Sequence, residues 1–487
     1  MHHFLALDLG AESGRGMIVT LDGGTMTEEE IHRFPNRTVP MAGTLHWDFP
    51  GLMAEIHEAI RICAHRGIEL TSIGVDTWGV DFGLLGADGK LLGNPVCYRD
   101  TRTVGIHAYA DAKLDRREIF KLTAYEPWPI ASLFQLLAMQ RDGSPILPVA
   151  QGFLNMPDLI NYFLTGEQRS DKAIANTTNV MDIDGHWSRR IINACGLPDM
   201  FVDLVEPATV MGTLSKEVQD ETGLFVDVPV VAACGHDTSA AMVAVPAQPD
   251  TRWAFLSCGT WSIPGMLIDS PITTDRVLEL SFTNEYTVEG WYVAQNIIGL
   301  WLVQQLRRKW NTPEAPLDYA QMTAKAAEAG QGPIINAADD SLMAPADMEA
   351  ALLALVKQGG QVEPAGRGEL VYGVLQSLAL QYNVAINAME ELTGERPEAL
   401  YMVGGGTRNT LLCQLTADAC GMPVQTGVEE CTSLGNACCQ ALATGVLRSV
   451  EEAREVMRNS YDVRSFEPKD QDAWAKRRET YAGLQQG

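Results

Sequence analysis

The feature that most constrains the fold is a hairpin pattern that occurs twice. Phe4 to Gly10 reads as a strand, Ala11 to Arg15 as a tight turn and Gly16 to Leu21 as a second strand. About 250 residues later, Trp253 to Gly265 repeats the order of strand, Gly-Thr/Ser turn and strand. A turn of this kind places backbone N–H groups around a small concavity that suits phosphate oxygens. The recurrence indicates an internal duplication.

The chain is long enough for two domains. Its 487 residues exceed one ordinary hydrophobic core, and two prolines mark a linker at 244–250. We expect an α/β protein in which each half is a sheet with helices on both faces. The predicted parts are an N-terminal domain at 1–246, a C-terminal domain at 247–465 and a helical tail at 466–487.

A third glycine cluster lies at 403–409, after the apolar segment 400–402. A glycine-rich turn between strand and helix lets a flat or anionic ligand approach the backbone closely. Two phosphate-type hairpins and one such turn predict a duplicated ATPase core, with nucleotide held in a cleft between the halves.

A carboxylate follows a buried strand in the segment 228–241, VPVVAACGHDTSAA. Burial and neighbouring charges can raise the pKa of Asp237 toward the range of a general base. The alternative is that Asp237 only caps the next helix, with Thr238 as a second capping candidate. These residues alone do not decide between the two.

Two other groups of polar residues are candidates for a site. Asp8 precedes the first turn and could hold Mg²⁺ through water, or be a buried aspartate in a plain hairpin. The strand-like block 73–85 is dense in Asp, Trp and Gly, which fits a polyol site or a buried hairpin. It is not decided which of Asp76, Asp81 and Asp100 contacts sugar.

The segment from Ala294 to Trp310 reads as one apolar-periodic helix. Asn296 and Gln304 are eight residues apart and would lie near one face of that helix. Such a pair is either hydrogen-bonded in the core or part of a cleft wall.

Charge and cysteine content exclude several classes. There are 62 acidic against 36 basic residues, a formal charge of −26, which argues against nucleic acid or anionic membrane as a partner. The 10 cysteines form no CxxC pair and read as reduced thiols. With no signal peptide and no apolar run of roughly 18 residues, we expect a cytoplasmic protein.

Taken together, these residues resemble the FGGY family of sugar kinases, which has the duplicated ribonuclease-H-like, actin-like ATPase fold. The resemblance covers about Phe4 to Thr444. It rests on the segments DLGAESGR at 8–15, GVDTWGVDFG at 74–83, YRDTRT at 98–103, GHDT at 235–238, NIIGLW at 296–301 and VGGG at 403–406. One departure is Ala11, where the family usually has threonine; the members most similar in these segments also have alanine.

The resemblance implies a role for each matching residue. Asp237 would be the catalytic base, and the sugar would be bound by Gly83, His236, Asp237, Thr238 and Asn296. ATP would be bound by Ala11, Glu12, Ser13, Gly14, Arg15, Thr260, Gln304 and Gly405. Asp8 would hold Mg²⁺.

Within the family, these segments are most similar to members that act on L-rhamnulose. The implied reaction transfers phosphate from ATP to the C1 hydroxyl of L-rhamnulose, in L-rhamnose catabolism, with Mg²⁺ bridging phosphates. The enzyme would be a monomer or a small homo-oligomer. Alternatives are a kinase for L-fuculose or L-xylulose, a catalytically silent regulator that binds sugar or nucleotide, and a chaperone-like or filament-forming ATPase, which would lack the block at 73–85.

Overall fold

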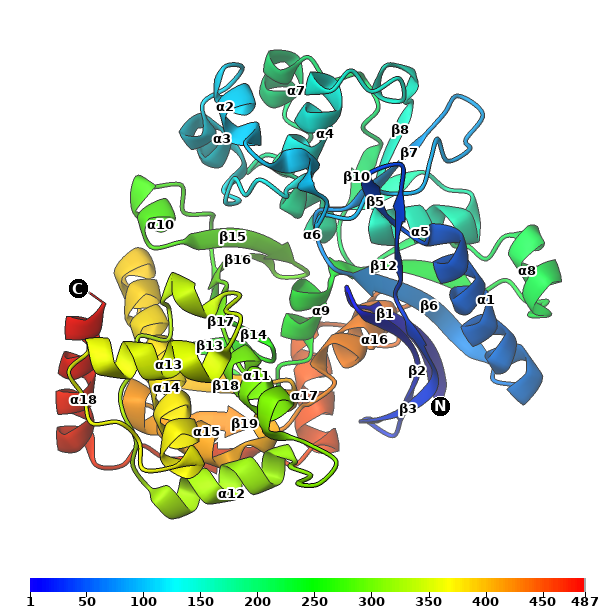
Figure 1. Ribbon diagram of the computed structural model, residues 1–487. Helices are drawn as coiled ribbons and strands as arrows, with labels where there is room; N and C mark the ends of the chain where they lie inside the picture. The colour runs from blue at the N-terminus through cyan, green and yellow to red at the C-terminus, as the bar shows by residue number, and fades with distance from the viewer. Residues whose placement is uncertain (486–487) are drawn as a thin grey trace. The chain divides into compact units, whose positions relative to one another are not determined.

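The computed structural model describes residues 1–485, which form two compact units (Figure 1). The first unit comprises Met1–Val245, Leu267–Val293 and Cys431–Ser460. The second comprises Pro246–Met266, Ala294–Glu430 and the chain from Tyr461 onward. Both units are therefore built from separate stretches of sequence. None of the helices in the described residues is long and apolar enough to cross a membrane.

The first unit is built on a six-stranded sheet in the order β11-β12-β6-β1-β2-β3. β1 is antiparallel to β2 and parallel to β6, and β6 is parallel to β12. The inner strands β1, β6 and β12 are almost continuously buried because helices cover the sheet. The strands are β1 His2–Leu9, β2 Ser13–Asp22, β3 Thr25–Pro35, β6 Leu70–Thr77, β11 Thr209–Thr213 and β12 Pro229–His236.

Helix α1, Phe49–Arg66, shows how sequence determines one of these covering elements. It begins at Asp48, whose carboxylate accepts a hydrogen bond from the Gly51 amide, and ends at Gly67 in the left-handed region, φ 65°. Its buried face includes Ile56 and Ile60, four residues apart, as an amphipathic helix requires.

The first unit has further elements around this sheet. Its helices are α2 Ile106–Asp111, α3 Arg116–Thr123, α4 Ser132–Arg141, α5 Met156–Thr165, α6 Lys172–Ala175, α7 Arg189–Cys195, α8 Lys216–Thr222, α9 Asp237–Val243, α10 Asp275–Glu279, α16 Cys431–Ala443 and α17 Val450–Ser460. Its other strands are β4 Thr38–Met41, β5 Thr44–Trp47, β7 Phe82–Leu85, β8 Gly152–Asn155, β9 Arg169–Asp171, β10 Asp203–Val205, β15 Phe282–Thr287 and the start of β16 Gly290–Gln295.

The second unit contains the strand order β14-β13-β18-β19-β20, with β17 paired to β14. These strands are β13 Trp253–Cys258, β14 Trp261–Ile268, β17 Ile297–Ile298, β18 Ala399–Val403, β19 Val424–Thr426 and β20 Arg464–Phe466. The helices are α11 Trp301–Trp310, α12 Tyr319–Ala329, α13 Met348–Gln358, α14 Arg367–Thr393, α15 Thr410–Cys420 and α18 Gln471–Leu484.

Both predicted hairpins are present, as β1–β2 and β13–β14, and the glycine cluster does join β18 to α15. The first turn is shorter than expected, because β2 begins at Ser13. The two sheets, each with adjoining helices, confirm the α/β fold class. The division at residue 246 stays a prediction. All ten cysteines are free and buried.

Two predicted helices are interrupted by strand, and the block predicted as strand-like is divided into two strands. The segment 294–310 is not one helix: β16 ends at Gln295, β17 follows, and α11 begins only at Trp301. The block 73–85 divides between β6 and β7, which pairs with β8 instead of joining the main sheet. The stretch 153–166, which the sequence predicts to be one helix ended by a glycine, begins instead as strand β8, and its helix starts at Met156. In each case a short β element interrupts an apolar run that periodicity alone assigns to one element.

Candidate active site

Three carboxylates gather at the carboxyl ends of adjacent strands in the first unit. Asp8 is near the end of β1, and its register partner on β6 is Asp76. Asp237 directly follows β12, whose last residue pairs with Thr77 of β6. Because β12, β6 and β1 are parallel, their carboxyl ends lie at the same edge of the sheet. In open α/β sheets, ligands bind at this edge.

Asp8 is held by two donors. Arg15, its register partner on β2, donates from Nη2 to Oδ2 at 2.5 Å, and the Ser433 hydroxyl of α16 donates to the same oxygen at 3.1 Å. No donor among the described residues is recorded at Oδ1. The hairpin thus brings the Arg15 guanidinium to the Asp8 carboxylate and leaves Oδ1 available to a ligand.

Asp76 is fully buried. Its Oδ2 accepts a hydrogen bond from Asn436 at 2.6 Å, while Oδ1 has no partner. Desolvation and the nearby Asp8 carboxylate raise the pKa of Asp76 well above its usual value, against the effect of Asn436. The protonated form is therefore favoured here more than at an exposed aspartate.

Asp237 begins α9. Its Oδ1 accepts from the Thr238 amide at 2.6 Å and the Thr238 hydroxyl at 3.1 Å. Within the described part of the chain, no donor is recorded at Oδ2, and 36% of the side-chain surface is exposed. Desolvation by the surrounding protein raises the pKa of Asp237, His236 lowers it and the Asp8 carboxylate raises it. Thr238 thus orients the carboxylate while Oδ2 stays open to a ligand.

His236 lies between two carboxylates. Its Nδ1 lies 3.0 Å from Glu285 Oε2, and its Nε2 lies 3.6 Å from Asp237 Oδ1. The contact with Glu285 is an ion pair without hydrogen-bond geometry. Burial lowers the pKa of His236, but the Glu285 and Asp237 carboxylates outweigh it and raise the pKa to about 9. The imidazole is therefore cationic at neutral pH.

The turn residues predicted to bind nucleotide lie beside Asp8. The Gly10 amide donates to the Ser13 carbonyl at 2.9 Å, which closes the turn. A Cβ at Gly14 would be 2.3 Å from the Phe34 ring, so this position requires glycine for packing. Ala11 and Glu12 are in the turn, and Ser13, Gly14 and Arg15 open β2.

The structure does not support Trp78 and Asp81 as sugar ligands. The Asp81 carboxylate accepts from the indole nitrogens of Trp47 and Trp78 at 2.7 and 3.0 Å, and also from the Tyr98 amide and Gln135. Trp78 is 6% exposed and packs on Trp47. Both are core residues. Asp100 similarly accepts from the amides of Leu45 and Arg102.

Gly83 and Asn296 belong to elements other than the strands that hold the three carboxylates. Gly83 is buried in β7, where a Cβ would meet Leu159 at 2.6 Å. Asn296 is in the second unit, between β16 and β17. The assignment of sugar contacts to these two residues stays a prediction.

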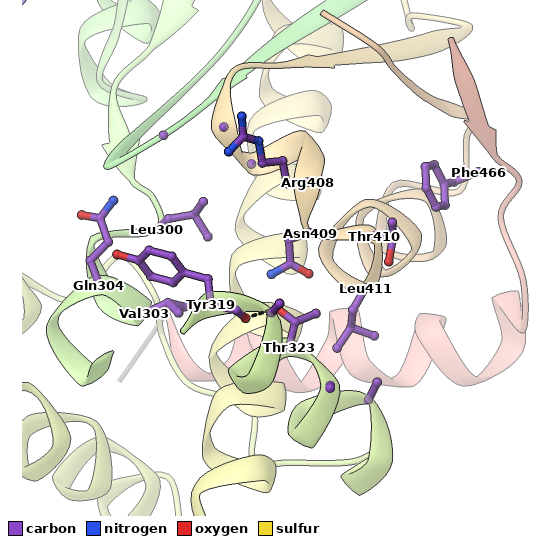
Figure 2. A pocket seen from close by; sticks show the side chains of 16 residues that line it. Leu300, Val303, Gln304, Tyr319, Thr323, Arg408, Asn409, Thr410, Leu411 and Phe466 are labelled. Atoms are coloured by element: carbon purple, nitrogen blue, oxygen red, sulfur yellow. Dashed lines mark hydrogen bonds between the residues drawn. The ribbon is translucent and has the colours of Figure 1, made fainter. Parts of the chain in front are cut away.

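The second unit contains a pocket of about 970 Å³ (Figure 2). Such a volume is ample for a nucleotide-sized ligand. Residues from three elements surround it: Gln304 from α11, Tyr319 and Thr323 from α12, and Asn409 and Leu411 from the α15 region. Gly259, Gly405 and Gly406 also line it, so both glycine turns of this unit reach the pocket.

Thr260 and Gln304 are in direct contact. The Thr260 hydroxyl lies 3.2 Å from Gln304 Oε1 and 3.1 Å from Nε2. Gly405 has open space where a Cβ would be, whereas a Cβ at Gly406 would be 2.3 Å from Cys258 Sγ. The pocket thus brings together Gln304 and Gly405, two of the residues predicted to bind ATP, with Thr260 adjoining.

Sequence reasoning missed several residues of these sites. Glu285 is a single carboxylate in the buried strand FTNEYT, an unusual place for a charge. Ser433, Asn436 and Gln440 are spaced i, i+3 and i+7 on the otherwise apolar α16, which is a detectable polar stripe. All three donate to groups of β1 or β6.

Comparison with known proteins identifies the family. Models of the FGGY family of carbohydrate kinases match residues 3–244 (N-terminal domain) and 254–444 (C-terminal domain). A rhamnulokinase of Bacteroides thetaiotaomicron is 39% identical over 97% of each chain. The chain belongs to the FGGY family of carbohydrate kinases. It is thus an enzyme that uses ATP and a sugar, as its sequence motifs predict.

Other relatives agree with this assignment. Rhamnulokinases of Klebsiella pneumoniae and Oceanobacillus iheyensis are 36% and 32% identical, over 96% and 95% of this chain and 95% and 97% of theirs. A ligand-bound xylulose kinase from Lactobacillus acidophilus superposes with a TM-score of 0.82 at 16% identity, over 100% of this chain and 97% of that one. A glycerol kinase from Plasmodium falciparum with ADP gives 0.79 at 17%, over 100% and 98%. The two-domain FGGY kinase fold is confirmed.

Proposed function

We propose that the protein transfers the γ-phosphoryl group of ATP to the C1 hydroxyl of L-rhamnulose. The observation that carries the proposal is the Asp237 carboxylate, which is oriented by Thr238 and open at Oδ2. The names of the relatives support the choice of ketose. The proposal places the enzyme in L-rhamnose catabolism, in the cytoplasm, as a monomer or small homo-oligomer.

The proposed chemistry needs one base and accurate alignment. Asp237 Oδ2 accepts the proton of the C1 hydroxyl as the oxygen forms its bond to the γ-phosphorus. The bond from the γ-phosphorus to the β,γ-bridging oxygen breaks, and the electron pair leaves with ADP. Proton transfer requires an ionised Asp237, so the neighbouring charges that set its pKa matter directly to the rate.

The pocket beside Gln304 and Gly405 is proposed to hold the adenosine part of ATP. It combines apolar walls, such as Leu300 and Leu411, with a few polar side chains, as sites for flat heterocycles do. The exposed backbone of Gly405 allows close approach of a ligand.

The residues of the first unit fit Mg²⁺. Asp8 has an oxygen without a recorded donor, and Asp76 Oδ1 is buried and unpaired. The described residues contain no closed group of three or more metal-ligating side chains, but Mg²⁺ usually takes only one or two carboxylates and completes its shell with water and substrate phosphates. When bound, the ion would neutralise charge on the phosphates.

The test is ADP release with magnesium-ATP across L-rhamnulose, L-fuculose, L-xylulose, D-xylulose, L-ribulose and glycerol, with ³¹P and ¹³C NMR of the product to locate the phosphate. We expect preference for L-rhamnulose and phosphate at C1. Preference for another ketose would overturn the substrate. ATP binding without turnover on any sugar would favour a silent regulator.

A further inference from the structure

The buried strand β15 of the first unit contributes a carboxylate that the proposed reaction has not yet used. Glu285 is 2% exposed. Its Oε2 accepts a hydrogen bond from the Tyr292 hydroxyl at 2.6 Å and lies 3.0 Å from His236 Nδ1. Burying a carboxylate is costly unless it is paired. Its position directly behind the residue before Asp237 therefore calls for a functional explanation.

The side chains of Glu285, His236 and Asp237 form a row that ends at Asp237, the proposed base. Glu285 contacts Nδ1 of His236, and the opposite ring nitrogen, Nε2, points to Asp237 Oδ1 at 3.6 Å. The Tyr292 hydroxyl also contacts the Ser239 hydroxyl of α9 at 3.0 Å, so strands β15 and β16 are tied to the helix that begins with Asp237. A base oriented by an imidazole, itself oriented by a second carboxylate, is a recurrent arrangement in active sites.

We propose that Glu285 is a positioning residue that fixes His236 as a cation and thereby keeps Asp237 ionised for proton acceptance. This inference rests on the proposed function of Asp237 as base.

The charges around this row explain why Asp237 needs a cationic neighbour to stay ionised. Asp237 is subject to desolvation and to the Asp8 carboxylate, which both raise its pKa, and His236 is the largest influence that lowers it. Glu285 in turn is the main influence that raises the pKa of His236, to about 9. The other titratable groups that act on this row are Tyr125 and Tyr292, which are neutral because burial raises the pKa of each well above 10, and Asp76, which interacts with Asp237.

The sign of the effect follows from these contacts. Replacing Glu285 by Gln keeps the shape and removes the negative charge, so the pKa of His236 falls and the ring becomes neutral at a lower pH. The Asp237 carboxylate then loses its cationic neighbour and its pKa rises. Since the base works only when ionised, the acid limb of the kcat/KM profile moves to higher pH.

The experiment compares wild type, Glu285→Gln, Tyr292→Phe and Glu279→Gln over pH 5.5 to 9. We expect Glu285→Gln to move the acid limb of the kcat/KM profile up by about one pH unit. At a pH below the limb, kcat/KM should be roughly tenfold lower than in wild type, and this difference should become smaller toward pH 8. The KM for ATP should not change. Tyr292→Phe should move the limb less. Glu279→Gln removes an equal charge from an exposed ion pair with Arg276 on α10 and should leave the profile unchanged.

A second readout needs no turnover. The ¹³C-labelled His236 ring, assigned by loss of its signal in His236→Asn, should titrate at least one unit lower in Glu285→Gln than in wild type. The proposal is overturned if folded Glu285→Gln has an unchanged acid limb and an unchanged His236 titration. It is also overturned if kcat/KM falls by the same factor at every pH, because that indicates a purely structural role. If Glu285→Gln does not fold, Tyr292→Phe decides by the same criteria. If wild type phosphorylates no ketose, the proposed function fails and the ring titration still tests the pairing.

Discussion

The two glycine hairpins share the order of strand, glycine turn and strand, but they differ in turn length and in chemistry. In β1–β2 the Gly10 amide donates to the Ser13 carbonyl at 2.9 Å, and in β13–β14 the Gly259 amide donates to the Trp261 carbonyl at 2.9 Å. Aligned on these glycines, Asp8 corresponds to Ser257 and Ala11 to Thr260. The first hairpin holds an ion pair with Arg15, whereas the second holds a neutral contact between Thr260 and Gln304.

This difference teaches that the duplicated scaffold is used for two tasks. Around the first hairpin lie the carboxylates Asp76 and Asp237, whose pKa values are raised by burial and by the nearby Asp8 carboxylate. Around the second lies a roomy pocket with a largely neutral lining. We infer that proton and charge handling belong to the first unit and that the adenosine part of the nucleotide is held by the second. The predictions below test that separation.

The largest effect is expected for Asp237→Asn. The amide cannot accept the proton, so kcat should fall by about 10³-fold or more. ATP binding, measured by calorimetry, should be unchanged because the pocket lies in the other unit. A variant with turnover within tenfold of wild type would remove Asp237 from the base role.

Asp8→Ser gives the first hairpin the residue type of Ser257, which stands at the corresponding position of the second hairpin. We expect kcat to fall about 10²-fold and the half-saturating Mg²⁺ concentration to rise, since a hard cation loses an oxygen ligand. The measurement is a magnesium titration of steady-state kinetics. Ser257→Ala at the corresponding position serves as the control, with little change in the Mg²⁺ requirement. Equal Mg²⁺ dependence of Asp8→Ser and wild type would contradict the assignment of the metal.

Gly406→Ala tests the packing of the second hairpin against its glycine turn. The new Cβ would be 2.3 Å from Cys258 Sγ in a buried contact. Overpacking of this kind typically costs about 1–3 kcal/mol in the free energy of unfolding, measured by urea titration. Gly405→Ala is the matched control: it meets nothing within 4 Å and should cost less than about 1 kcal/mol. Similar losses in both variants would refute this packing explanation.

Thr260→Ala gives the second hairpin the residue that the first has at this turn position. It removes only a neutral hydrogen bond to Gln304, so the KM for ATP should rise about three- to tenfold with kcat nearly unchanged. Initial rates at varied ATP decide this. A fall in kcat as large as that of Asp8→Ser would mean that the hairpins are equivalent after all.

The sequence predicts local elements of this molecule well. β1–β2, β13–β14, the strand before Asp237 and the glycine turn before α15 all have short apolar runs bounded by glycine or polar residues. Such signals act within a few residues, so the chain itself displays them. The position of Asp237 at a strand-to-helix junction follows from the same kind of signal.

Long-range partners were not predictable in this way. The sequence leaves Asp81 open as a sugar ligand because nothing nearby in the chain shows that Trp47 and Gln135 occupy its oxygens. The helix expected over 294–310 failed because strand pairing with β14 overrides the local periodicity. Glu285 and Asn436 reach the carboxylates from distant segments, and only the folded chain brings them there.

The polar stripe of α16 has a consequence for biosynthesis. Ser433, Asn436 and Gln440 supply hydrogen bonds to Asp8, to Asp76 and to the Leu5 carbonyl, more than 350 residues earlier in the chain. On the ribosome, the N-terminal sheet has been made long before α16 emerges, and during that interval the hydrogen bonds that α16 supplies are missing. Because domains generally fold as units during synthesis, completion of the first unit, which extends to Ser460, must wait until translation has passed that residue. A nascent chain stalled earlier should remain open to chaperones and proteases.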